Sequence, residues 1–195
     1  MTNYWGRLFV AVAVSAVGLL AIAPVRVSAE DKPAENDRRV TLAEGKIVLD
    51  APKSWVRKQP KNKIIEHEFA IPSGQDEQPE GRFTVMGAGG SVDANITRWL
   101  GQFVQSDGAA TKDKAKIEKR KIAGVEVHCV DVAGDFKDSP GPFAPAVMRP
   151  DYRMLAAIIV TDKLGQHFLK FYGPKQVVAA NEKAFEEMLN SLQLK

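Results

Sequence analysis

The run "YRMLAAIIVTD", residues 152–162, is the most hydrophobic segment that follows the amino-terminal 29 residues. It has no polar face at a period of two, so it predicts a central strand that is covered on both sides. "KLGQ" then turns the chain, and "HFLKFYG" returns as an antiparallel strand. A strand buried on both faces requires a helix layer on each face of its sheet.

The remaining strands follow from alternating hydrophobic residues and from turn residues. Three precede the first helix, in "GKIVLDAP", "NKIIEHEFAIP" and "RFTVMG". "KAKIEKRKI" and "VEVHCVDVAG" come after that helix, and the "AG" between them predicts a tight hairpin. These segments and the two above give a mainly antiparallel sheet of about seven strands.

Two amphipathic helices complete the pattern. Residues 91–104 predict a helix that begins at Ser91 or Asp93 and ends near Gly108. A second helix is expected within "PKQVVAANEKAFEEMLNSLQ". Their apolar faces are marked by Ile96, Trp99, Leu100, Phe103 and Val104, and by Phe185, Met188, Leu189 and Leu192. The predicted fold class is α+β, with helices on both faces of the sheet in an α/β/α sandwich.

The amino-terminal segment predicts an extracytoplasmic destination. Arg7 precedes an uninterrupted apolar run, and "VSA" ends at Ala29 ahead of "ED". This order is typical of a secretory signal in residues 1–29 that is cleaved after Ala29. An uncleaved membrane anchor is the alternative, but the run is shorter than the ~20 residues that a spanning helix needs. We expect a secreted or periplasmic protein without a stable membrane span after cleavage.

The rest of the chain is expected to contain a flexible linker at residues 30–40 and a single domain at 41–195. Loss of residues 1–29 removes Arg7 and Arg26, which lowers the 27 basic residues to 25 against 24 acidic ones. This near balance argues against nucleic acid as a partner. Cys129 is the only cysteine, so no intramolecular disulfide can form, and we expect Cys129 to be a small buried residue.

The stretch "GAGGSVDANITRWLGQF" resembles a phosphate-binding loop because glycines lead into a helix. Its spacing fails the dinucleotide fingerprint, since Val92 stands where a third glycine is needed, and no Gly-Lys-Ser/Thr follows. A small anion could still bind at the helix N-terminus formed by Gly89, Gly90 and Ser91. Asp93 would repel that anion, so a tight turn from strand to helix is the favoured interpretation.

Three histidines offer an alternative, a metal-dependent hydrolase. His67, His128 and His167 lie in different predicted strands, and no HxH or HxxxH spacing occurs. A zinc site would also need a nearby carboxylate, such as Glu66, Glu68 or Asp131. There is no Gly-x-Ser-x-Gly motif either, and the adjacent residues His128 and Cys129 face opposite ways on a strand. The sequence therefore predicts neither an enzyme nor a cofactor.

The segment "SPGPFAPAVMRP", residues 139–150, predicts a surface loop because proline interrupts regular structure. It would present Phe143 and Met148 on a stiff backbone, which lowers the entropy lost when a partner binds. The alternative is a loop that folds against its own domain. Trp55 and Trp99 are expected in the core.

Several segments together resemble the PsbP-like superfamily over about residues 41–195. The segments are "APKSW", "GRFTVMGAGG" before "NITRW", "YRMLAAIIV", "HFLKFYGP" and the terminal "AFEEMLNSL". That superfamily includes an extrinsic subunit of photosystem II, a Ran-binding nuclear import factor and bacterial secreted or lipid-anchored proteins. Two points depart from it: the proline-rich segment at 139–150, and the absence of any feature that ties the chain to photosynthesis.

The resemblance implies a noncatalytic role in binding or assembly outside the cytoplasm. The expected partner is another protein or a component of the cell envelope, and the sequence sets no oligomeric state.

Overall fold

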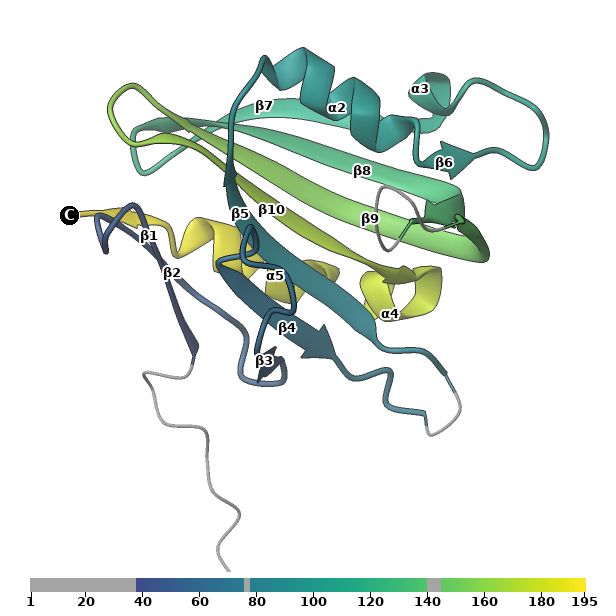
Figure 1. Cartoon of the computed structure of the whole chain (residues 1–195), viewed down its shortest axis with the longest axis horizontal. Helices are drawn as coiled ribbons and strands as arrows, with labels where there is room; N and C mark the ends of the chain where they lie inside the picture. Colours follow the sequence, from purple (N-terminus) through teal and green to yellow (C-terminus); the bar gives the residue numbers. More distant parts are fainter. Residues whose placement is uncertain (1–37, 76–77, 140–144) are drawn as a thin grey trace, which may run out of the picture. The chain divides into compact units, whose positions relative to one another are not determined.

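The computed structural model describes residues 38–75, 78–139 and 145–195 (Figure 1). The strands are β1 (Arg39–Leu42), β2 (Ile47–Asp50), β3 (Val56–Lys58), β4 (His67–Ile71), β5 (Gly81–Ala88), β6 (Phe103–Val104), β7 (Lys116–Ile122), β8 (Val125–Asp138), β9 (Val147–Thr161), β10 (Gly165–Pro174) and β11 (Gln193–Leu194). The helices are α2 (Val92–Leu100), α3 (Thr111–Lys114), α4 (Lys175–Ala180) and α5 (Glu182–Asn190).

Within the described ranges, the main sheet has eight antiparallel strands in the order β3-β4-β5-β10-β9-β8-β6, with β7 paired to β8, and a smaller sheet has three strands in the order β1-β2-β11. In β9 the residues from Met154 to Ile159 are all buried, which confirms a central strand covered on both sides. The α+β class with a large antiparallel sheet is likewise confirmed.

Each face of the main sheet carries its own hydrophobic core. One core joins α4, α5 and the smaller sheet to the side of β9 that holds Leu155, Ala157 and Ile159. The other joins α2 to the opposite side of β9. Figure 1 shows α2 and the α4–α5 pair on the two sides of the strands. Trp55 lies in the first core and Trp99 in the second, as predicted.

The first predicted helix is shorter than expected, and the prediction that it ends near Gly108 is wrong. α2 ends at Leu100, and the Gly101 N–H donates to the carbonyls of Thr97 and Trp99. Phe103 then pairs with Phe136 of β8, with ring centroids 5.1 Å apart. Gly101 disfavours further helix, and this aromatic contact holds the following residues in β6 instead.

Two segments expected to be irregular contain strands. β1 begins at Arg39, within the range expected to be linker, and Val40 is fully buried. The prediction of a loop through residue 150 is wrong, because β9 begins at Val147 and pairs with the end of β8. Pro150 has no partner in that ladder, so it is tolerated at an irregularity where no N–H is required.

Candidate functional site: a cationic cleft beside α2

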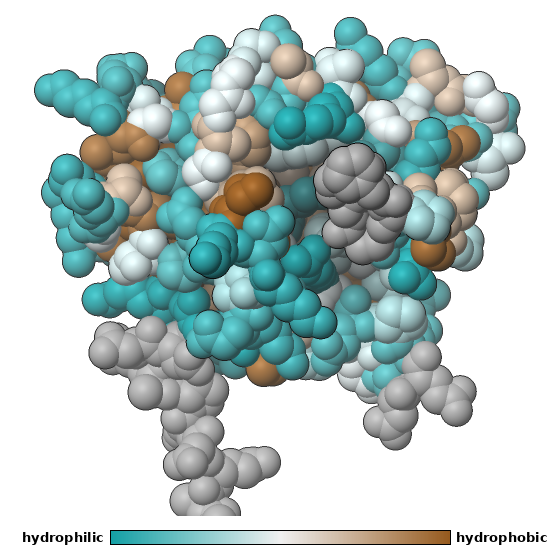
Figure 2. Space-filling view, in the orientation of Figure 1, coloured by the Kyte–Doolittle hydropathy of each residue, from teal (hydrophilic) through white to brown (hydrophobic). Residues whose placement is uncertain are grey.

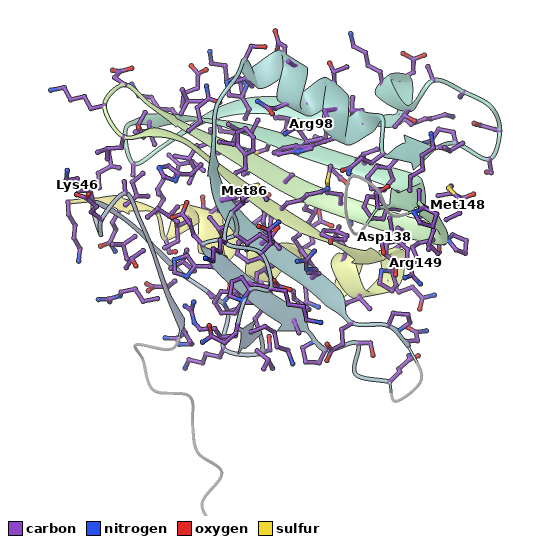
Figure 3. The ribbon with its side chains drawn as sticks, viewed as in Figure 1. Lys46, Met86, Arg98, Asp138, Met148 and Arg149 are labelled. Carbon is purple, nitrogen blue, oxygen red and sulfur yellow. The ribbon has the colours of Figure 1, made fainter. Side chains whose placement is uncertain are left out.

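A cleft of about 610 Å³ opens on the α2 side of the main sheet. Strands β5, β8, β9 and β10 supply most of its lining. A neighbouring hollow of about 190 Å³ shares Met86, Gln102 and Lys170 with it and extends to Arg98 and Trp99. Figure 3 labels Met86 and Arg98 near α2, and Asp138 and Arg149 farther along the sheet. Clefts of this size hold small ligands or the side chains of a partner.

Strand alternation places cationic and aromatic side chains together on this face. Lys170 pairs with Thr84 and Tyr172 with Arg82 across the β5–β10 ladder. Because residues two apart share a face, Arg82, Lys170 and Tyr172 all project toward the cleft. All three line it.

A bulge in β9 adds Arg149 to the same face. Tyr152 pairs with Gly134, but Arg149 pairs with Phe136, so β9 holds an extra residue at this point. Asp151 within the bulge has a positive φ of 52°. A one-residue shift exchanges the faces of a strand, so Arg149 joins Tyr152 on the cleft side. Arg149 Nε donates to Asp138 Oδ2 at 3.3 Å.

Lys170 is a largely desolvated charge in the cleft lining. Its Nζ donates to Gln102 Oε1 at 2.5 Å and lies 5.3 Å and 5.0 Å from the ring centroids of Phe136 and Tyr172. Among the described residues no carboxylate lies within 4.0 Å of this ammonium. Burial lowers the pKa of Lys170 to about 8, and the positive charges of Arg82 and Arg98 act in the same direction.

The two arginines have different partners. Arg82 Nε donates to Glu68 Oε1 and Arg82 Nη1 to the Tyr172 hydroxyl, each at 2.8 Å. Burial alone would lower the pKa of Arg82, but these two hydrogen bonds raise it. Arg98 Nη2 instead donates to the side-chain oxygen of Asn95 at 2.7 Å. Arg82 is thus neutralised by Glu68, whereas Arg98 is held by a neutral amide.

The chemistry of this lining favours recognition. Neither histidine nor cysteine occurs among the described residues that line the cleft. Its polar groups include cations, amides, phenols, hydroxyls and the carboxylates of Glu80 and Asp138, and groups of these kinds can bind and orient a ligand.

The Gly-rich turn uses its polar groups within the chain. The Ser91 side chain accepts from the Ala94 N–H and caps α2. Asn95 Nδ2 donates to the carbonyls of Gly89 and Ser91, and Gln166 Nε2 donates to that of Gly90. Gly90 has a φ of 90°, which glycine adopts readily. These contacts support a turn from strand to helix; binding of a small anion at Gly89, Gly90 and Ser91 stays a prediction.

The structure does not bring the three histidines together. His128 pairs with Ile158 on the α2 side, whereas His67 and His167 share the other face with Val85 and Ile159. His67 contacts Arg57 and the Thr41 carbonyl, His128 contacts Glu126, and His167 contacts the Leu164 carbonyl. Within the described ranges no three residues of His, Cys, Asp or Glu cluster as metal ligands.

Met148 and Cys129 lie outside the cleft lining. Met148 is 48% exposed and pairs with Lys137, so it lies on the opposite face of the hairpin from Arg149 (Figure 3). Phe143 and Ala29 fall outside the described residues. Cys129 is buried as expected, and burial raises the pKa of its thiol.

Sequence reasoning missed Arg82, Arg98, Arg149 and Lys170. One signal was available for Lys170, because "FLKFY" places a lysine between Phe168 and Tyr172 on one face of a strand that adjoins the central one. A charge in that position requires either a partner or a function. Arg149 gave no such signal, since the β9 bulge that turns it inward cannot be read from alternation.

The surface carries no large hydrophobic area in the view of Figure 2, where hydrophobic residues form separate patches among hydrophilic ones. In the part of the chain that the structure describes, no helix combines the length and the apolar character needed to cross a membrane.

No protein-family model and no curated protein matches this chain. Solved structures do. Cyanobacterial PsbP (CyanoP) from Synechocystis sp. PCC 6803 is 9% identical with a TM-score of 0.49, over 80% of this chain and 91% of that one. LpqN, involved in cell envelope biogenesis of Mycobacterium tuberculosis, is 7% identical with a TM-score of 0.47, over 76% and 83%.

The Ran-binding protein Mog1p of Saccharomyces cerevisiae is 10% identical with a TM-score of 0.47, over 83% of this chain and 96% of that one. These structures include a PsbP and a Ran-binding protein, two kinds of protein that the PsbP-like resemblance named. At such identities no ligand or partner is carried over to this chain.

Proposed function

We propose that this chain is a noncatalytic binding module that acts outside the cytoplasm and holds a protein or envelope component in the cleft beside α2. Lys170 is the observation that carries the proposal. Its ammonium lies on a central part of the sheet and contacts an amide and two rings, and burial disfavours its charge and lowers its pKa. Charged side chains whose pKa is strongly shifted by the loss of solvation are concentrated at functional sites.

The extracytoplasmic part of the proposal predicts a defined amino terminus. Expression of the full chain in a bacterial host with an intact secretory pathway should give a mature protein that begins at Glu30, because small residues precede the cut at Ala29. Intact-mass measurement of the envelope fraction checks this. Protein that retains residues 1–29 and stays with the membrane would support the uncleaved anchor instead.

The binding part predicts that filling the cleft abolishes partner capture. Met86 lines both hollows from β5, and Met86→Trp adds bulk there without changing a charge. The protein is incubated with native envelope extract, recovered, and its bound components are compared by mass spectrometry. We expect Met86→Trp to lose components that the wild-type protein retains.

Met148→Trp is the matched control, because it makes the same substitution at an exposed position outside the cleft. It should capture the same components as the wild-type protein. Loss with Met148→Trp and retention with Met86→Trp would transfer the site to the β8–β9 hairpin. A bound component whose mass changes during incubation would contradict a noncatalytic role.

A further inference from the structure

We infer that the cleft binds an anionic group, a carboxylate or a phosphate, carried beside a flat ring, and that Lys170 is its main contact. This inference rests on the proposed function and specifies the class of ligand.

The charges of the lining side chains indicate that the ligand is negatively charged. Among the described residues, four cationic and two carboxylate side chains line the cleft. Lys61 and Glu80 are exposed and balance each other in sign, and Asp138 is engaged by Arg149. Lys170 therefore keeps an unbalanced charge within the lining.

The adjoining hollow also has an excess of positive charge. Arg98 and Lys170 both line it, and each donates to a neutral amide oxygen, on Asn95 and Gln102 respectively. An incoming anion would accept hydrogen bonds from two cations for which no described residue supplies a carboxylate partner. Such charge-assisted bonds are stronger than bonds between neutral groups.

Aromatic rings next to these cations indicate that the ligand also carries a flat ring. Phe136 stacks on Tyr152 with centroids 5.9 Å apart and planes 5° apart, and its ring also lies 5.2 Å from that of Tyr172. Phe136 is buried, whereas Tyr152 and Tyr172 are only partly buried and both line the cleft. A flat ring can pack against these two tyrosines while its anionic group reaches Lys170.

Four probes of similar size test the inference: benzoate, phenyl phosphate, benzamidine and benzyl alcohol. Each is titrated into the ¹⁵N-labelled protein, and backbone amide shifts are followed by NMR. We expect benzoate or phenyl phosphate to shift the amides of Thr84, Lys170 and Tyr172 saturably, and the stronger of the two identifies the anion. The cation benzamidine and the neutral alcohol should leave these amides unchanged.

Lys170→Met should weaken anion binding by about tenfold or more, the usual consequence of removing a charged hydrogen-bond partner. Lys163→Met, at an exposed turn position outside the cleft lining, should bind as the wild-type protein does. Equal shifts with benzamidine and benzoate, or full benzoate binding by Lys170→Met, would overturn the inference.

The capture experiment separates this inference from the proposed function. If Met86→Trp loses its partner while neither anion shifts the cleft amides, the ligand class is wrong and the cleft is still the binding site. If Met86→Trp retains every component that the wild-type protein captures, the proposed function itself fails.

Discussion

Replacing Lys170 by methionine should raise the free energy of unfolding by about 1–2 kcal/mol at pH 7, although it removes a cation from the cleft. A pKa lowered from 10.5 to about 8 corresponds to a charge disfavoured by about 3 kcal/mol in the folded state. The cation–π contacts with Phe136 and Tyr172 offset roughly 0.5–2 kcal/mol of this penalty. Methionine keeps the length and the packing of the side chain without the charge.

The gain should depend on pH with a defined sign. Below pH 8, Lys170 is protonated in both the folded and the unfolded state, so the full penalty acts on the folded wild-type protein. Between pH 8 and 10.5 the folded protein releases this proton while the unfolded chain retains it. The contribution of Lys170 to the free energy of unfolding of the wild-type protein therefore rises with pH. The advantage of Lys170→Met should shrink across that interval and vanish above it.

Urea unfolding of both proteins at several pH values measures the difference directly, and other titrating groups cancel in the comparison. Lys163→Met serves as the control and should change stability by less than about 0.5 kcal/mol at every pH, since its side chain is exposed. If Lys170→Met is less stable than the wild-type protein at pH 7, then the contacts with Gln102 and the rings outweigh the burial of the charge.

The charge of Lys170 lowers the stability of the folded protein, and this explains why sequence patterns identified the core but not the site. The run at 152–162 has one clear pattern, which is that neither face of the expected strand is polar. Burial of β9 on both sides follows from this pattern. A helix on each side is then required by packing. The site depends on features that oppose such patterns: a lysine within a buried strand and an arginine turned inward by an extra residue.

Register is the part that local patterns could not supply. Met148 and Arg149 are neighbours in a segment rich in proline, and period-two alternation from Tyr152 would have turned Met148 to the cleft. The β9 bulge reverses this assignment, and it is defined only by pairing with β8. Arg98 is not part of the apolar face predicted for this helix, and its position beside Lys170 depends on how α2 crosses the sheet.

Gly134→Ala should destabilise the protein by about 3–5 kcal/mol, because strain and overpacking act together at this residue. Gly134 has a φ of 148°, which side chains rarely adopt. A Cβ atom there would lie 2.7 Å from the Val104 carbonyl oxygen and 2.8 Å from Gln105 Nε2. Gln105 Nε2 also donates to the Ala133 carbonyl at 2.9 Å, so the side chain cannot withdraw without losing this bond.

The same substitution should disturb the cleft, because Gly134 pairs with Tyr152 at the start of the β9 bulge. Gly89→Ala is the matched control: its Cβ meets no atom within 4 Å, and its stability should stay within about 0.5 kcal/mol of the wild-type value. Thermal and urea unfolding measure both variants, and amide shifts of Tyr152 and Arg149 report the bulge. A Gly134→Ala protein within about 1 kcal/mol of wild type would mean that β6 can move away from β8. The bulge, and with it the inward position of Arg149, would then not depend on the close approach of these two strands.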